Sequence, residues 1–273
     1  VAMTGDGVND SPALKNADIG IAMGITGTDV AKEVSKAVLA DDNFATIVNA
    51  VAEGRNIYDK MIKSTRYLLS CNMGEIVAVF FAIMLGFPLP LTPLQILLMN
   101  LVTDGLPALG LGVEPAEGDV MKRPPRNPRE KPITGSSLLL IVLFGIVMGA
   151  GTLFIFRLYV GTSLLLAQTA AFTTLVMFEM FAVIGSRSLS PFKKLNPFTN
   201  KWLLGGVALS ILIQLATIYW APLQPIFSTV PLGMAEWAKI LVVSSLGFVL
   251  MELGKIFIAQ PNNHKNSTAV QSA

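Results

Sequence analysis

Six apolar runs constrain this sequence more than any other feature. Each is close to the roughly 20 residues that an α-helix needs to cross the hydrocarbon core of a bilayer. Of the 273 residues, 52% are apolar and 14% are charged, whereas soluble domains carry about 25% charged residues. The chain is therefore predicted to be a membrane protein. The predicted spans are residues 67–86, 94–113, 137–159, 168–186, 202–221 and 237–258.

Basic residues between the runs predict how the spans are oriented. The second connection (114–136) and the fourth (187–201) are rich in Lys and Arg, whereas the first (87–93), third (160–167) and fifth (222–236) contain neither. Because basic loops stay on the cytoplasmic side, both ends of the chain are predicted to be cytoplasmic. The lipid bilayer is a predicted partner. A net charge of +2, grouped in these loops, does not indicate a nucleic-acid partner.

The residues before the first run have a soluble character. Short apolar pieces separated by Gly, Asp and Asn predict βα units of a parallel sheet in residues 1–42. A helix capped by Asp42 or Asn43 is expected to form a cytoplasmic stalk over 43–66 and to enter the bilayer unbroken. Residues 259–273 are expected to be a disordered cytoplasmic tail.

Two further features concern the chain as a whole. Val1 opens a strand-like run without the basic and apolar regions of a signal peptide, so the sequence is interpreted as a piece of a longer protein. Cys71, the single cysteine, lies in an apolar run and is predicted to be a buried thiol. One cysteine leaves the redox compartment undetermined.

A glycine-rich acidic motif follows the first strand-like run. It reads Thr4-Gly5-Asp6-Gly7-Val8-Asn9-Asp10. A carboxylate at the carboxyl end of a parallel strand suits Mg²⁺, which binds through one or two carboxylates and phosphate oxygens. Gly5 and Gly7 allow a ligand to approach the backbone closely. An ordinary Asx-rich turn fits the same residues, and spacing alone leaves both interpretations open.

The first, second and fourth predicted spans carry the carboxylates Glu75, Asp104 and Glu179. A carboxylate at the bilayer centre costs at least roughly 2.5 kcal/mol, so such residues are candidates for a functional site. The middle of every predicted span lacks Lys and Arg. Neutralisation is therefore expected to come from protonation or from a bound cation.

Polar neighbours share a helix face with these acids. Asn72 precedes Glu75 by three residues, and Asn100 and Thr103 precede Asp104. All these ligand atoms are oxygens, which favours a hard cation such as Ca²⁺. It stays open that Asn72 and Asn100 only bond across helices and that Glu179 is a buried protonated acid.

The second run also contains a helix-breaking pair. Pro107 has no N–H to bond the carbonyl of Thr103, and Gly105 loosens the turn between them. A backbone oxygen is thus expected to be free beside Asp104. Interrupted helices at membrane depth commonly build ion sites.

Residues 4–14 closely resemble the hinge motif of P-type ATPases, whose phosphorylation domain has the haloacid dehalogenase fold. The resemblance continues through 17–24 and 38–44 and covers most of the chain to about residue 258. It implies that Asp6 coordinates the catalytic Mg²⁺ and that Asn9 and Asp10 hold the phosphoryl group and order the site, a structural role of Asp10 staying open. Thr4, Gly5 and Gly7 would complete the cofactor-binding turn. ATP would be bound mainly by the part of the pump missing here.

The polar motifs in the spans resemble those of calcium pumps of the sarco/endoplasmic reticulum type. By resemblance, one calcium site would be formed by Asn72, Glu75, Thr103, Asp104 and Glu179, and a second would use Asn100 and Asp104. The fold implied is a membrane all-α bundle, the fifth to tenth spans of the pump, preceded by a partial α/β haloacid dehalogenase-like segment. The short third connection fits a bacterial version, placed as a multi-pass protein in the plasma membrane.

The resemblance implies an ATP-driven pump that exports Ca²⁺ through an aspartyl-phosphate intermediate with proton counter-transport. The chain lacks the family's phosphorylated segment, so it is expected to be inactive alone and to need the remainder of the pump as its partner. Pumping of Mn²⁺ or Na⁺ remains an alternative, although sodium pumps have an acid where Asn100 stands. A non-catalytic truncated membrane module is a second alternative. A secondary exchanger is disfavoured because it would not need Asp6.

Overall fold

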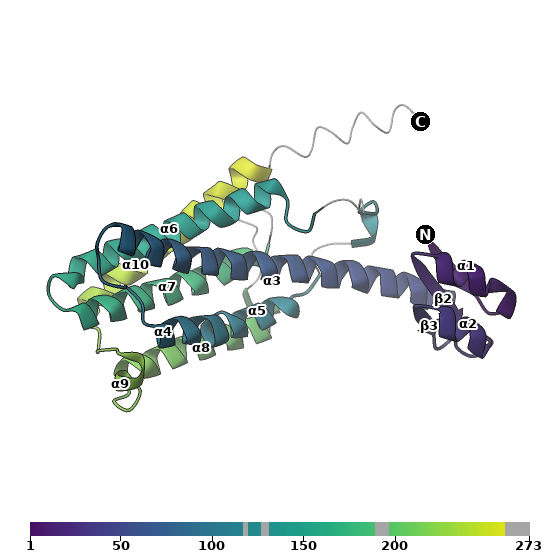
Figure 1. Cartoon of the computed structure of the whole chain (residues 1–273), viewed down its shortest axis with the longest axis horizontal. Coiled ribbons are helices and arrows are strands. Elements are labelled where there is room, and N and C mark those ends of the chain that lie inside the picture. Colours follow the sequence, from purple (N-terminus) through teal and green to yellow (C-terminus); the bar gives the residue numbers. More distant parts are fainter. Residues whose placement is uncertain (117–119, 127–130, 189–196, 260–273) are drawn as a thin grey trace. The chain divides into compact units, whose positions relative to one another are not determined.

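The computed structural model describes residues 1–116, 120–126, 131–188 and 197–259. It forms two compact units. The first contains residues 1–58 and 120–123, and the second contains the described parts of 59–119 and 124–273. The helices and strands of both units are shown in Figure 1. The predicted tail after residue 259 lies outside the described residues.

The first unit contains a parallel three-stranded sheet in the order β1-β2-β3. The strands are β1 (Ala2–Gly5), β2 (Ile19–Met23) and β3 (Ala37–Leu39). Parallel neighbours require crossover connections, which are supplied by α1 (Ser11–Asn16) and α2 (Asp29–Val34). Leu14, Ala22 and Ala31 form the buried core between helices and sheet. The βα units expected in residues 1–42 are present.

Helix α3 (Phe44–Met84) runs for 41 residues, which corresponds to about 60 Å. Asn43 rather than Asp42 caps it, because the Asn43 Oδ1 accepts a hydrogen bond from the Ala45 N–H at 3.0 Å. In its first part the Arg55 guanidinium donates to the carbonyls of Val120 and Arg123, at 2.9 and 2.7 Å. The helix continues without a break through residue 66, as the sequence predicts.

Six helices in the described part of the chain are long and apolar enough to cross a membrane. Apart from the start of α3 at Phe44, they begin and end close to the predicted runs. The fourth begins at Leu164 instead of 168 because Ser163 caps it. The short helix α9 (Gln224–Phe227) lies in the fifth connection. The six are α3, the segment Pro93–Gly112, α6 (Gly135–Val160), α7 (Leu164–Ser186), α8 (Lys201–Tyr219) and α10 (Met234–Ala259).

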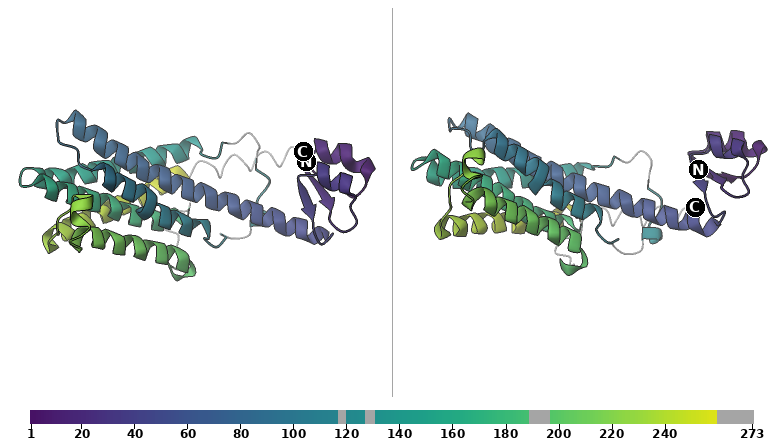
Figure 2. Two further views of the ribbon diagram at one scale, coloured as in Figure 1. Left: turned by 60° about the horizontal axis from the view of Figure 1, so that its bottom comes forward. Right: turned by 90° about the horizontal axis from the view of Figure 1, so that it is seen from below.

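Helix α7 is the most enclosed of these helices. In its most apolar stretch of 18 residues, 67% is buried inside the structure, whereas the corresponding share in the other five helices is at most 44%. It packs against α6 and α10, and Figure 2 shows α6 and α7 side by side. Its buried residues Phe172, Leu175 and Phe178 share one core cluster with Tyr67 and Cys71 of α3. The prediction that Cys71 is a buried thiol is confirmed.

Glycines bring α6 against α3. A Cβ built on Gly145 would lie 2.3 Å from the Met73 Cγ, and one on Gly149 would lie 2.4 Å from the Val77 Cγ1. Neither contact is possible for a larger residue without moving a helix. Small residues four positions apart are a common device for close helix packing in membranes. The contact holds the part of α3 that carries Glu75.

A buried ion pair joins three chain segments at one end of the second unit. Arg187, just after α7, donates from Nε and Nη2 to the Glu114 Oε1 at 2.9 and 2.7 Å. Asn200, which caps α8, donates to the Glu114 Oε2 at 2.6 Å and to the Gly110 carbonyl at 2.8 Å. The sequence analysis did not identify this cluster, because its members lie outside the predicted spans and far apart along the chain.

Candidate functional site

Three buried carboxylates from three different helical segments meet in the second unit. Glu75 comes from α3, Asp104 from the interrupted second span and Glu179 from the enclosed helix α7. Each side chain offers one oxygen, and these oxygens lie within 4.8 Å of one another. At most 6% of any of the three residues is exposed. The carboxylates of the first, second and fourth predicted spans therefore form one cluster.

The backbone of the second span is irregular where Asp104 lies. The helix is divided into α4 (Pro93–Leu98), a π-helical turn (Met99–Thr103) and α5 (Gly105–Gly112). The Asp104 N–H accordingly donates to the Met99 carbonyl, five residues back, at 2.8 Å. Single π turns inside helices are frequent at functional sites. The helix is irregular beside Asp104, as the sequence predicts, but the irregular turn precedes Asp104 instead of lying at Pro107. A free Thr103 carbonyl stays a prediction.

Two polar side chains of the second span orient the carboxylates of Glu75 and Glu179. The Asn100 Nδ2 donates to both oxygens of Glu75, at 3.0 and 2.9 Å. The Thr103 hydroxyl donates to the Glu179 Oε2 at 2.9 Å. One irregular turn therefore connects α3 with α7 through side chains that the sequence analysis identified.

Two oxygens in the cluster have no donor. Among the described residues, the Asp104 Oδ2 and the Glu179 Oε1 are buried and accept no hydrogen bond. An unsatisfied buried polar atom is costly, and a buried charge needs a partner. Three carboxylates with two unpartnered oxygens match what a hard cation requires, since Ca²⁺ takes six to eight oxygen ligands.

Asn72 and Tyr67 add two details that the sequence did not specify. The Asn72 Nδ2 donates to the Leu68 carbonyl of its own helix at 2.8 Å, a bond that does not link it to the carboxylates. Tyr67, which the sequence analysis did not select, is almost fully buried, and its hydroxyl donates to the Asp104 Oδ1 at 3.1 Å. Its sequence signal is a tyrosine in an apolar run, because a buried phenol needs a hydrogen-bond partner.

The acidic motif forms the turn after β1 in the first unit. The Asp10 carboxylate accepts hydrogen bonds from the N–H groups of Asp6 and Gly7, at 3.1 and 3.0 Å. A Cβ on Gly5 would lie 2.6 Å from the Asp10 Cβ, so only glycine allows this approach. Asp10 thus has the structural role that the sequence left open.

The other residues of the motif leave their side chains available. Asp6 and Asn9 are exposed, and Thr4 is half-buried at the end of β1. The Asp6 carboxylate takes part in no hydrogen bond or ion pair among the described residues. It lies at the carboxyl end of a parallel strand, where ligands of such sheets bind. These features fit Mg²⁺ coordination through one carboxylate and phosphate oxygens.

Asp42 organises the neighbouring loop of the same sheet. Its carboxylate accepts hydrogen bonds from the N–H groups of Gly24, Ile25 and Thr26, at 2.6, 3.0 and 2.7 Å. These bonds lower the pKa of Asp42 to about 2, and the bond from Ile25 has the largest effect. Desolvation acts in the opposite direction and raises the pKa. Asp42 adopts a left-handed backbone conformation with φ 48°. It therefore fastens the loop after β2 to the end of β3.

The chain was compared with known protein families and curated proteins. A family model described as "Cation transporting ATPase, C-terminus" matches residues 88–257. The chain is 50% identical over 254 residues to the calcium-transporting ATPase of Bacillus subtilis (strain 168), with 92% of this chain and 28% of that protein covered.

Two further relatives carry similar names. Calcium-transporting ATPase 1 of Bacillus cereus is 45% identical over 276 residues, with 94% of this chain and 31% of that protein covered. The endoplasmic reticulum-type calcium-transporting ATPase 3 of Arabidopsis thaliana is 41% identical over 286 residues, with 93% and 29% covered. The chain thus spans less than a third of the length of these relatives. With a family model matching more than half of its residues, the chain belongs to the P-type cation-transporting ATPases.

Proposed function

We propose that this chain supplies the membrane cation site and part of the phosphate site of an ATP-driven pump that exports Ca²⁺ from the cytoplasm. The observation that carries the proposal is the cluster of Glu75, Asp104 and Glu179, whose oxygens lie within 4.8 Å of one another. The three relatives are all named calcium-transporting ATPases, which favours Ca²⁺ over Mn²⁺ and Na⁺ as the transported ion. The ligand set is Glu75, Thr103, Asp104 and Glu179, with Asn100 and Asn72 contributing amide oxygens.

The carboxylates account for both directions of transport in this scheme. A buried acid cluster needs positive charge, which is supplied either by the cation or by protons. When Ca²⁺ leaves the cluster, protons take its place and are carried back as the counter-ion. Tyr67 and Thr103 donate hydroxyl hydrogen bonds to Asp104 and Glu179 and so orient both acids in the structure described here.

The acidic motif provides the phosphate chemistry together with the rest of the pump. Bound Mg²⁺ would neutralise charge on the transferred phosphoryl group. Asp6 would hold the ion, Asn9 would donate to phosphate oxygens, and Asp10 keeps the turn in shape. The phosphorylated aspartate and most of the ATP site would be supplied by the remaining two thirds of the pump. Helix α3, which is continuous from Phe44 to Met84, would transmit the state of the phosphate site to Glu75.

The proposal is tested in the full-length pump by phosphorylation from ATP. Glu75→Gln and Asp104→Asn are expected to abolish Ca²⁺-stimulated phosphorylation because each removes a ligand charge. Glu53→Gln, on the exposed face of the same helix α3, is the matched control and should keep normal Ca²⁺ dependence. Phosphorylation from inorganic phosphate without Ca²⁺ should survive in the Asp104→Asn variant, which shows that it folds. Normal Ca²⁺ dependence in either site variant would refute the assignment.

The same assay identifies the transported ion. If Mn²⁺ or Na⁺ stimulated phosphorylation at lower concentrations than Ca²⁺, that ion would be the cargo instead of Ca²⁺.

We also propose that the protein is a multi-pass protein of a bacterial plasma membrane. Both ends of this segment would be cytoplasmic, because the connections 114–136 and 187–201 are basic. Labelling of a cysteine introduced at Met121 from the cytoplasmic side only is the expected result.

A further inference from the structure

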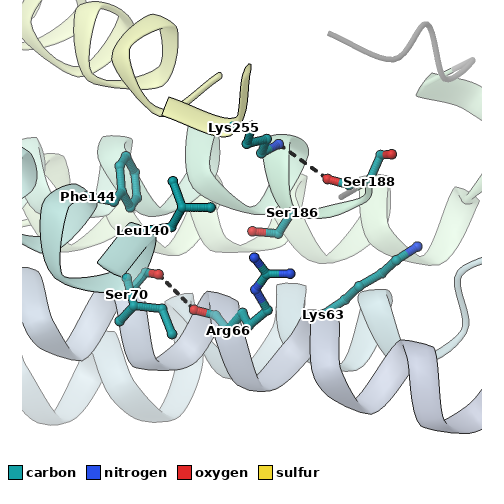
Figure 3. Close-up of a pocket in the computed structure, with 9 residues that line it drawn as sticks. Lys63, Arg66, Ser70, Leu140, Phe144, Ser186, Ser188 and Lys255 are labelled. Carbon is teal, nitrogen blue, oxygen red and sulfur yellow. Dashed lines mark hydrogen bonds between the residues drawn. The ribbon is translucent and has the colours of Figure 1, made fainter. Parts of the chain in front are cut away.

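A pocket with basic and hydroxyl side chains opens among four helices of the second unit, away from the carboxylate cluster. It has a volume of about 480 Å³, which includes space open to solvent. Lys63 and Arg66 enter from α3, and Lys255 enters from α10. Figure 3 shows the Arg66 guanidinium pointing from α3 toward Ser186, and Lys255 on the opposite side. Three basic side chains thus surround one space.

The charges in the pocket do not cancel. Lys255 is paired with Glu252, and its Nζ also donates to the Gly185 carbonyl at 2.7 Å. The half-buried Arg66 guanidinium takes part in no hydrogen bond or ion pair among the described residues. Because a guanidinium presents five donors in a fixed planar fork, an oxyanion is the partner it fits best. The Arg66 guanidinium therefore gives the pocket a positive charge with unused donors.

The remaining lining is of two kinds. Ser70, Ser186 and Ser188 add hydroxyls to the lining, and those of Ser70 and Ser186 donate to the carbonyls of Arg66 and Ala182, both at 2.8 Å. Leu140, Ile141 and Phe144 of α6 form an apolar wall. A soluble anion gains nothing from such a wall, whereas a lipid places its glycerol and acyl chains against one. The lining therefore suits a molecule with an anionic head and an apolar body.

The position of the pocket along the spans agrees with this chemistry. Lys63 and Arg66 come just before the first predicted span, Ser186 and Ser188 lie at the end of the fourth, and Lys255 lies near the end of the sixth. These span ends are on the side of the basic connections, where phospholipid headgroups lie. Basic pockets between transmembrane helices on this side bind anionic headgroups. We infer that the pocket binds the phosphate group of an anionic phospholipid, with Arg66 as its main donor.

The inference is tested by titrating the purified full-length pump with phosphatidylglycerol and counting bound lipids by native mass spectrometry. Arg66→Gln should weaken phosphatidylglycerol binding about fivefold. One basic residue near an anionic membrane surface contributes about 1 kcal/mol of binding free energy, which corresponds to that factor in affinity. Removing Lys63 as well should weaken it further. Arg66→Lys keeps the charge but not the planar fork, so its affinity should lie between those of the parent and Arg66→Gln. Lys201→Gln, which changes an exposed lysine at the start of α8, should retain the full affinity.

Three results would overturn the inference. They are equal affinity of phosphatidylglycerol for the parent and Arg66→Gln, equal binding of phosphatidylcholine to the parent, and Arg66-dependent binding of inorganic phosphate without Arg66-dependent binding of the lipid. Melting temperature is measured on every variant, and Arg66→Lys keeps the test valid if Arg66→Gln fails to fold. The readout is lipid binding, so it does not depend on which ion the pump transports.

Discussion

Replacing Arg187 by methionine tests how strongly the buried ion pair holds the second unit together. The side chains of Arg187 and Glu114 are 5% and 4% exposed, and their closest atoms are 2.7 Å apart. Methionine fills similar volume but leaves the Glu114 carboxylate with the Asn200 amide as its side-chain donor among the described residues. Removing one partner of a buried pair costs about 3–5 kcal/mol. Arg187→Met is therefore expected to lose about that much stability.

The loss is measured as the melting temperature of the full-length pump in nanodiscs. About 2–4 °C are lost per kcal/mol in domains of about 150–250 residues, so a fall on the order of 10 °C is expected. Adding Glu114→Gln should restore most of the loss, because the uncompensated charge is then gone. Lys201→Met, which removes an exposed charge at the start of α8, should change melting by no more than about 2 °C. An equally small change in Arg187→Met, or no recovery in the double variant, would refute the reasoning.

Two further predictions concern the loop after β2 and the contact between α3 and α6. Asp42→Asn should increase amide exchange of Gly24, Ile25 and Thr26 at neutral pH, and unchanged exchange would contradict the role of the charge. Because the pKa of Asp42 is lowered from 3.8 to about 2, its contribution is complete above about pH 4 and is lost as pH falls toward 2. Gly145→Leu should separate α3 from α6 and reduce the Ca²⁺ affinity of ATP-driven phosphorylation at least about tenfold, whereas Gly161→Leu, where a Cβ meets nothing, should not.

The spans and the acid cluster could be predicted because both depend on strong local signals. A run of apolar residues predicts a spanning helix without reference to the rest of the chain. A carboxylate inside such a run is costly enough to single out Glu75, Asp104 and Glu179 individually. The resemblance to calcium pumps implies that these three acids converge, and the structure brings them together.

The parts that were missed depend on contacts between distant residues. Glu114 and Arg187 are 73 positions apart and form their pair only after α5 and α7 are packed. Tyr67 and Asp104 are 37 positions apart. Asp42 was expected to be one of two possible caps of α3, but its carboxylate binds the loop after β2, which no local pattern indicates. Periodicity and capping rules describe one element at a time, so they do not reach such contacts.

The three acids differ in how firmly the fold holds them, which indicates where the cation site can change. Glu179 lies on α7, the most enclosed helix, and Glu75 lies on the stretch of α3 that Gly145 and Gly149 hold against α6. Asp104 instead follows a π-helical turn and precedes Gly105. A π turn holds one residue more than an α-helical turn, so its return to α geometry would rotate Asp104 about the span axis. We therefore expect cation binding and release to move the backbone at Asp104 more than the backbone at Glu179. Amide exchange is measured on the Ca²⁺-loaded and the Ca²⁺-free pump. The difference between the two states should be larger at residues 99–105 than at residues 172–182.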